Sequence, residues 1–233
     1  MSHASRGPDP DDAKWFDSLQ LARLRDAAHD VAWLIDRGYS RESAVRFVGD
    51  HHQLAARQRL ALVRGVVSEG ERRRRAKLEE GPEDVHRQTL VIDGLNVIIT
   101  LEVALGGGPL LACADGAIRD LAGLHGSYRP VRQTTEAVER IGAALTILRT
   151  SGARIYLDAP VASSGKLRAL FLEHASRWEL PVCVHLVRNP DACLAGERHV
   201  ASADAEVIDR SAGWFNLGAW LIRAIEGAWV IAL

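Results

Sequence analysis

The sequence has few cysteines, no excess of charge of either sign and no long apolar run. Its three cysteines, Cys113, Cys183 and Cys193, lack CxxC spacing and fit reduced thiols better than disulfides or a zinc site. A formal net charge of −1 excludes bulk attraction to nucleic acid, so any such binding must come from local patches. No apolar run is long enough to span a membrane, and the N-terminus lacks the apolar core of a signal peptide. We therefore expect a cytoplasmic protein without membrane association.

Hydrophobic residues make up 47% of the chain and charged residues 25%, which are ordinary globular values. The length of 233 residues suits one large α/β domain with an appendage, or two small domains. Composition and periodicity predict four segments: a disordered lead-in over residues 1–14, a helical bundle over 15–68, a charged linker over 69–88 and an α/β domain over 89–233.

Apolar residues at three- to four-residue spacing predict the N-terminal helices. The expected helices are Trp15 to Arg37 with a stop at Gly38, a short helix capped by Ser40 and ended by Gly49, and Gln53 to Val67. The layout is typical of a helix-turn-helix and equally of many small bundles, so DNA docking and a structural or RNA-facing bundle both stay open. A homodimer also remains an alternative, because these helices carry apolar residues that we expect to be exposed.

The linker contains a run of basic residues that either contacts phosphates or is simply solvated. Arg72 to Arg75 and Lys77 supply the positive charge, and four nearby glutamates partly balance it.

Alternating strands and helices in the rest of the chain predict a three-layer α/β/α fold with a mainly parallel sheet. Thr134 or Thr135 is expected to cap a helix, and a further helix is expected over Trp214–Ile225. The expected strands are Leu90 to Asp93, Ala153 to Pro160, Pro181 to Val187, His199 to Asp209 and Ala228 to Leu233.

An aspartate stands at or just after the end of four of these strands: Asp93, Asp158, Asp191 and Asp204. The carboxyl ends of parallel strands meet at one edge of a sheet, so these carboxylates are expected to cluster there. Clustered carboxylates repel one another unless a cation neutralises them or some are protonated. Their hard oxygen atoms favour Mg²⁺ or Mn²⁺, which can activate a water and stabilise the leaving oxygen of a phosphodiester. The alternative is that each aspartate merely caps the next helix.

Two further segments offer substrate-binding candidates. The glycine-rich segment Gly106 to Arg132 carries Arg119, His125 and Arg129, which would line a pocket unless the segment is an insertion packed over the sheet edge. Ser163 and Ser164 precede a helix and would hold an anion on its free N–H groups, or serve as an ordinary cap.

Short motifs in this region resemble PIN-like nucleases, particularly their NYN branch. VIDGLNVI is similar to the opening strand of that branch, YLDAP to its next strand end, and NPDACL with VASADAEVID to its later acidic positions. The resemblance implies a PIN-like domain over residues 89–233, within an uncharacterised family that has a helical front end. It implies a metal site of Asp93, Asp158, Asp191 and Asp204, with Asn96 orienting the first and Glu136 as a further acidic candidate.

The sequence departs from that pattern in the long insertion and in the short segment between Asp191 and the fourth strand. We expect a metal-dependent nuclease acting on RNA rather than DNA. The alternatives are a non-catalytic nucleic-acid or nucleotide-binding module, and a small-molecule phosphohydrolase with the insertion as its lid.

Overall fold

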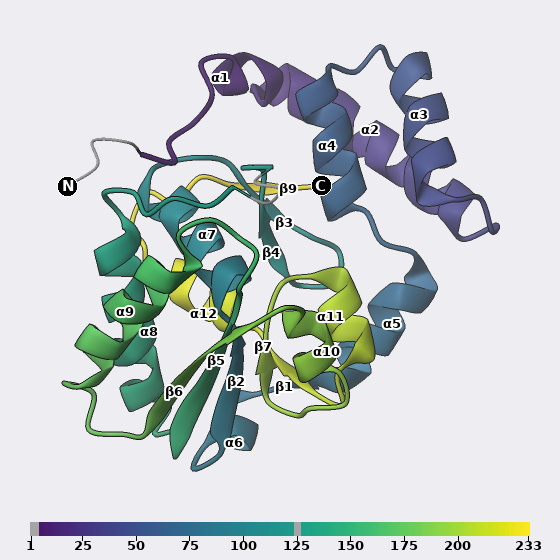
Figure 1. Cartoon of the computed structure of the whole chain (residues 1–233). Coiled ribbons are helices and arrows are strands. Elements are labelled where there is room, and N and C mark those ends of the chain that lie inside the picture. The colour runs from purple at the N-terminus through teal and green to yellow at the C-terminus, as the bar shows by residue number, and fades with distance from the viewer. Residues whose placement is uncertain (1–4, 124–126) are drawn as a thin grey trace.

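The computed structural model describes residues 5–123 and 127–233 of the chain (Figure 1). Its centre is a parallel sheet of six strands. In spatial order these are β1 (Glu79–Glu80), β8 (Trp214–Phe215), β7 (Val200–Ala201), β2 (Thr89–Asp93), β5 (Gly152–Asp158) and β6 (Val182–Val187). Every strand pair in this sheet is parallel. The predicted mixed α/β fold with a helical N-terminal region is confirmed.

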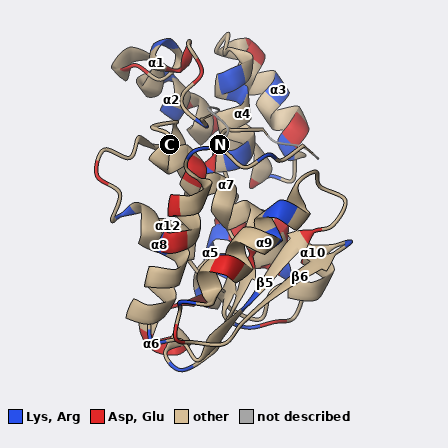
Figure 2. Ribbon diagram, turned by 60° about the vertical axis from the view of Figure 1, so that its left-hand side comes forward, with Lys and Arg blue, Asp and Glu red and all other residues tan. Residues whose placement is uncertain are grey.

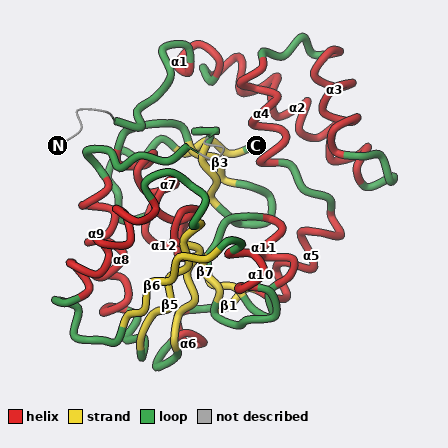
Figure 3. The backbone as a smooth tube through the Cα atoms, viewed as in Figure 1, coloured by secondary structure: helices red, strands yellow, loops and turns green. Residues whose placement is uncertain are grey.

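Helices cover both faces of the sheet. Strand β2 is continuously apolar because its side chains are buried on both of these faces. Leu90 and Ile92 pack into one core while Val91 packs into another on the opposite face. The first core is closed by α7 (Gly94–Leu105), α8 (Thr134–Ile147), α9 (Ser164–Ala175) and α12 (Leu217–Ile222). The second is closed by α5 (Glu69–Leu78), α10 (Pro190–Leu194) and α11 (Ala205–Arg210), as Figure 3 shows by element type.

The N-terminal helices form a bundle of their own beside this domain. They are α1 (Asp12–Trp15), α2 (Ser18–Ile35), α3 (Arg41–His51) and α4 (Ala56–Gly65). Gly38 has the left-handed φ of +89° expected of a helix stop, and the Ser40 side chain accepts the Ser43 N–H as the predicted cap. Figure 2 shows basic and acidic residues mixed across this bundle instead of one continuous basic face.

A small second sheet joins the bundle to the α/β domain. Strand β3 (Leu110–Ala112) pairs antiparallel with β4 (Ile118–Asp120) and parallel with β9 (Val230–Ala232). Leu111 and Ile231 from this sheet pack with Leu24 and Leu62 of the bundle in a single core. The C-terminal strand was expected to belong to the main sheet, and it instead completes this bridging sheet.

Three local expectations about the N-terminal region are wrong. Residues 5–14 do not form a disordered lead-in, because Arg6 pairs with buried Glu102 and Asp12 pairs with Arg57 at 2.7 Å. The helix expected over residues 15–37 is interrupted at Asp17, whose side chain caps α2, and Gly49 lies within α3 instead of ending it. Residues 1–4 of the expected lead-in lie outside the described residues.

The expected linker over residues 69–88 is also structured. It contains helix α5, strand β1 and helix α6 (Pro82–Val85). Ser68 and Glu71 form a capping box at the start of α5, since each side chain accepts the other residue's backbone N–H. The high charge of this segment therefore reflects ion pairing in a packed helix.

Three expectations about the C-terminal half need correction. Strand β7 ends at Ala201 because the Asp204 side chain accepts the N–H groups of Glu206 and Val207 and starts α11. The helix expected from Trp214 begins only at Leu217, since Trp214 and Phe215 pair with β1 as strand β8. Helix α8 has no side-chain cap from Thr134, whose hydroxyl donates to buried Glu102.

Candidate functional site

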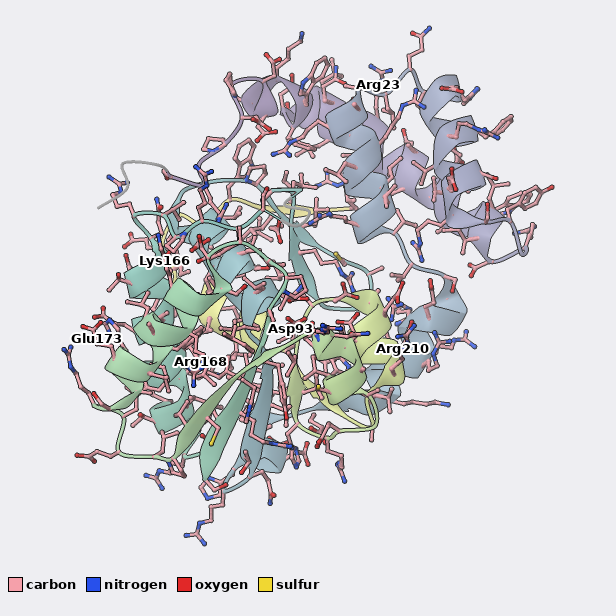
Figure 4. All side chains as sticks on the ribbon, viewed as in Figure 1. Arg23, Asp93, Lys166, Arg168, Glu173 and Arg210 are labelled. Carbon is pink, nitrogen blue, oxygen red and sulfur yellow. The ribbon has the colours of Figure 1, made fainter. Side chains whose placement is uncertain are left out.

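The four strand-end aspartates lie at the carboxyl ends of four adjacent strands. Asp93 ends β2, Asp158 ends β5, Asp191 stands in the first turn of α10 after β6, and Asp204 caps α11 after β7. Because the sheet order is β7-β2-β5-β6, these positions are neighbours in space. Figure 4 shows Asp93 near the centre of the molecule, where the strands end. We call this group the acidic edge.

Asp93 is the most buried member of the acidic edge, with 7% of its surface exposed. Its carboxylate accepts the Ser202 hydroxyl at 2.8 Å and the Asn96 N–H at 3.4 Å. Burial raises the pKa of Asp93 to about 7, and the charges of Asp204 and Asp158 raise it in the same direction. In the metal-free protein, therefore, a substantial fraction of Asp93 is protonated at neutral pH.

Two other members, Asp158 and Asp191, also have raised pKa values. The pKa of Asp158 is raised by burial and then by the charge of Asp191. The pKa of Asp191 is raised by burial and then by Asp204 and Glu206. The structure thus brings the four predicted aspartates within electrostatic reach of one another. Glu206 adds a fifth carboxylate that the strand-end pattern missed, because it lies in the first turn of α11 and not at a strand end.

Backbone contacts hold the segment that carries Asp204. The Asn96 side-chain oxygen accepts the Ala203 N–H at 2.8 Å, and the Arg119 Nε donates to the Ala203 carbonyl at 2.7 Å. The Ser202 hydroxyl accepts the Asp204 N–H at 3.0 Å while it donates to Asp93. Asn96 therefore positions the neighbouring strand end as well as its own.

Gly94 allows helix α7 to start directly against strand β5. A Cβ at this position would lie 2.6 Å from a methyl carbon of Leu157 and 2.8 Å from one of Ile155. A side chain here would push the helix, and Asp93 with it, away from the sheet. The start of α7 therefore approaches β5 closely, as the glycine next to Asp93 in the sequence indicates.

The acidic edge is not pre-arranged as a metal cage. In residues 5–123 and 127–233, no group of three or more His, Cys, Asp or Glu side chains is placed to hold a metal ion. The donor set nevertheless consists of carboxylate oxygens, which suit Mg²⁺ or Mn²⁺ chemically. Burial is the largest cause of the raised pKa values of Asp93, Asp158 and Asp191, and neighbouring negative charges add to it; a cation would offset both effects.

Arg119 belongs to a buried ion network. It contacts Asp115 at 2.7 Å, and Asp115 also accepts from Arg75 at 2.6 Å. Arg75 continues to Asp209 at 2.8 Å, and its side chain is 1% exposed. The two guanidinium groups lower the pKa of Asp115 despite its burial. The expectation that Arg75 contacts phosphates is wrong, because its charge is used inside the protein.

A cleft of about 540 Å³ opens beside the acidic edge. One wall comes from α7 and the start of α11, with Asn96, Thr100 and Asp204. The opposite wall comes from the N-terminal region, with Arg41 and Arg64. The cleft thus lies between the helical bundle and the α/β domain.

The remaining expected site residues lie elsewhere. Arg129 is exposed, and Glu136 forms an exposed pair with Arg140 on α8; neither lines the cleft. Ser163 and Ser164 stand at the start of α9 beyond β5, outside the cleft, and the buried Ser164 Oγ has no hydrogen-bond partner among the described residues. His125 lies outside the described residues. The lid expected of Gly106–Arg132 is replaced, over its described part, by strands β3 and β4.

Tyr156 lies next to Asp93 on the same face of the sheet, and His185 follows on the next strand. Tyr156 pairs in register with Asp93 on one side and with His185 on the other. The two rings stack with centroids 5.1 Å apart. Tyr156 is half-buried and His185 is exposed at the edge strand β6. Sequence patterns could not find this pair, because the strand register creates it.

Fold and site together define an α/β protein with an acidic sheet edge and an N-terminal helical bundle. The chain belongs to the family described as a domain of unknown function, DUF5616, which matches residues 82–220. Residues 23–77 match a second family, described as a protein of unknown function, DUF434. The family boundary falls between α5 and α6, so the cleft is lined by residues of both matched regions.

The chain is 30% identical over 187 residues to the uncharacterized protein MJ0935 of Methanocaldococcus jannaschii, covering 79% of this chain and 88% of that protein. A match of this length exceeds residues 82–233, so it includes part of the helical bundle. No solved structure matches the chain. None of the described helices is long and apolar enough to cross a membrane.

Proposed function

We propose that the protein is a metal-dependent nuclease that hydrolyses phosphodiester bonds in RNA. The observation that carries the proposal is the acidic edge, where burial and then neighbouring negative charges raise the pKa values of Asp93, Asp158 and Asp191. Such crowding destabilises the free protein, which is the expected signature of a site that binds a cation or positions charge for catalysis. The resemblance to PIN-like nucleases supports the same reading.

Asp93, Asp158, Asp191 and Asp204 would hold Mg²⁺ or Mn²⁺. When bound, the ion would supply Lewis-acid polarisation of the phosphodiester oxygens. The chain would contribute orientation: Ser202 and the Asn96 N–H fix the Asp93 carboxylate, and Asn96 with Arg119 fixes the Ala203 backbone next to Asp204. These contacts would limit the reorganisation needed when the substrate enters.

Single-stranded RNA is the substrate class that the surroundings favour. The exposed His185 ring stacks on Tyr156, which lies beside Asp93, and offers a flat surface for a base two strands from Asp93. Bases are available for stacking in single strands, whereas a duplex keeps them paired. The mixed charge on the helical bundle supports no basic face for duplex DNA (Figure 2). Two of its arginines are engaged in ion pairs, Arg57 with Asp12 and Arg59 with Asp50.

Cleavage of a labelled single-stranded RNA in Mn²⁺ tests the proposal. Wild-type protein should cleave, EDTA should abolish cleavage, and Asp93→Asn and Asp204→Asn should each lower the rate by at least about a hundredfold. Asp50→Asn is the matched control, because this aspartate is 69% exposed and pairs with Arg59 on the bundle. Activity that survives in both edge variants would refute the assignment.

RNA binding without cleavage, persisting in EDTA, would instead establish a non-catalytic binding module. Turnover of a nucleotide without oligonucleotide cleavage would establish a phosphohydrolase. We further infer a cytoplasmic location, supported by the free thiols of Cys113, Cys183 and Cys193 in the described structure.

A further inference from the structure

We propose that Arg64, on the helical bundle, binds a backbone phosphate of single-stranded RNA that lies in the cleft beside the acidic edge. The bundle and the α/β domain would then hold one substrate together. The inference rests on the proposed function for its ligand class, and its test separates binding from cleavage. It assigns a substrate-binding role to the region that matches DUF434.

The other arginines that line the cleft have their donors engaged. Arg41 donates to the Val66 carbonyl and to both oxygens of Glu71, at 3.0 and 2.9 Å. Arg75 and Arg119 belong to the buried network around Asp115. None of these three can turn toward a ligand without leaving a buried carboxylate or carbonyl unpaired.

Arg64 differs because part of its guanidinium group remains available. Its Nη1 donates to the Asp120 carbonyl at 2.7 Å and lies 3.3 Å from the Asp120 carboxylate. Its Nε and Nη2 make no hydrogen bond to any residue that the structure describes. The Asp120 carboxylate is itself occupied, since it accepts the Ala122 N–H at 2.8 Å and the Thr100 hydroxyl at 3.4 Å.

The contact of Nη1 with Asp120 orients the planar guanidinium group of Arg64. Its Nε and Nη2 remain as two free donors in the same plane. A guanidinium with adjacent free N–H groups is the geometry that binds a phosphate through two parallel hydrogen bonds. The side chain of Arg64 is 24% exposed and lines the cleft. A phosphate entering from solvent can therefore reach it without displacing an internal partner.

The side chain of Arg119 holds the distance between Arg64 and the acidic edge. Arg119 donates to the Arg64 carbonyl at 3.3 Å and to the Ala203 carbonyl at 2.7 Å. One side chain thus ties the end of α4 to the strand end that carries Asp204. This tie makes the spacing between a phosphate at Arg64 and a second phosphate at the acidic edge a fixed property of the fold.

The test is fluorescence anisotropy with a labelled single-stranded RNA of about 12 nucleotides. Binding is measured in EDTA over a series of salt concentrations for wild type, Arg64→Gln, Arg64→Lys and Arg46→Gln. Arg46 is the matched control, because it is exposed on the neighbouring helix α3 and does not line the cleft. Thermal unfolding of each variant checks that the fold is retained.

Arg64→Gln should bind about tenfold more weakly and reduce the slope of log K against log salt by about 0.7, the contribution of one single-strand phosphate. Arg64→Lys should keep the slope and lose part of the affinity, and Arg46→Gln should behave as wild type. A purely structural role for Arg64 would leave the salt slope of the folded variant unchanged.

Equal affinity and slope in Arg64→Gln and wild type would overturn the inference, even if Mn²⁺-dependent cleavage by Asp93 were established. Absence of RNA binding by wild type in both EDTA and Mn²⁺ would overturn it as well. RNA binding that depends on Arg64, with no cleavage in Mn²⁺, would support the inference while refuting the nuclease.

Discussion

Replacing Asp93 by asparagine is expected to stabilise the metal-free protein at neutral and alkaline pH. The Asp93 carboxyl is buried, and its pKa rises from 3.8 to about 7 on folding. A carboxyl with a raised folded pKa favours the folded state while it is protonated. That contribution is full below the unfolded pKa of 3.8 and is lost as the pH rises through about 7.

The size of the effect follows from the same shift. The interval from 3.8 to about 7 corresponds to about 4 kcal/mol of unfolding free energy, which is the upper limit of what the substitution can recover. Asp158 and Asp191 have raised pKa values and add pH dependence of the same sign. Asp115 and Asp209 have lowered pKa values, so their contributions are full above the pKa of unfolded aspartate and are lost as the pH falls from there through their lowered folded pKa values.

Urea unfolding in EDTA at several pH values between 5 and 8.5 measures the effect. Asp93→Asn should gain stability relative to wild type as the pH rises, by up to about 4 kcal/mol at the alkaline end. Asp209→Asn is the matched control, since the same change at a carboxylate paired with Arg75 should destabilise the protein. Mn²⁺ should stabilise wild type at pH 8 and have no such effect on Asp93→Asn.

The reasoning fails if the stability difference between Asp93→Asn and wild type does not change across this pH range. It fails equally if the variant is less stable than wild type at pH 8 in EDTA. Either result would mean that Asp93 is ionised in the folded protein without strain, and that the acidic edge is not crowded.

Three further substitutions test the architecture around the site by urea unfolding or hydrogen exchange. Gly94→Ala should destabilise by about 1–3 kcal/mol, since its Cβ would lie 2.6 Å from Leu157, whereas Gly165→Ala meets nothing within 4 Å and should be neutral or slightly stabilising. Arg75→Ala should destabilise by about 3–5 kcal/mol because it leaves buried Asp115 with one partner fewer, while the exposed Arg72→Ala should have no measurable effect. Asn96→Ala removes the acceptor of the Ala203 N–H, so exchange of that amide should accelerate, with a loss of about 1–3 kcal/mol. Unchanged stability in the first two cases, or unchanged exchange in the third, would contradict the packing described.

The local sequence was sufficient to predict elements whose signals lie within a few residues. Mainly apolar runs marked β2, β5 and β6, and β2 shows the reason most clearly, because a strand buried on both faces needs no polar side. Ser40 and Gly38 marked a helix start and a helix stop through their own hydrogen bonding and backbone conformation. The strand-end position of the four aspartates also follows from local order, once the strands are assigned.

Local sequence patterns did not predict the structure where a residue's partner is distant in the sequence. Arg75 reads as part of a solvated basic run, and only its contacts with Asp115 and Asp209 show that it is buried. The segment after Gly106 reads as a pocket-lining loop or an insertion packed over the sheet edge, and only its pairing with β9 makes it part of a second sheet. Local composition cannot distinguish these outcomes, because burial depends on which surfaces meet.

The sequence by itself determined the fold class, the strands at the centre of the sheet and the four aspartates at their ends. These features depend on hydrophobic periodicity and on the rule that parallel strands end at one edge. Tertiary structure alone decided that Tyr156 stands between Asp93 and His185, that Arg119 holds the Ala203 backbone, and that Arg64 faces the cleft. Each of these relations joins segments far apart in the chain, and their proximity follows from strand register and helix packing instead of local preference.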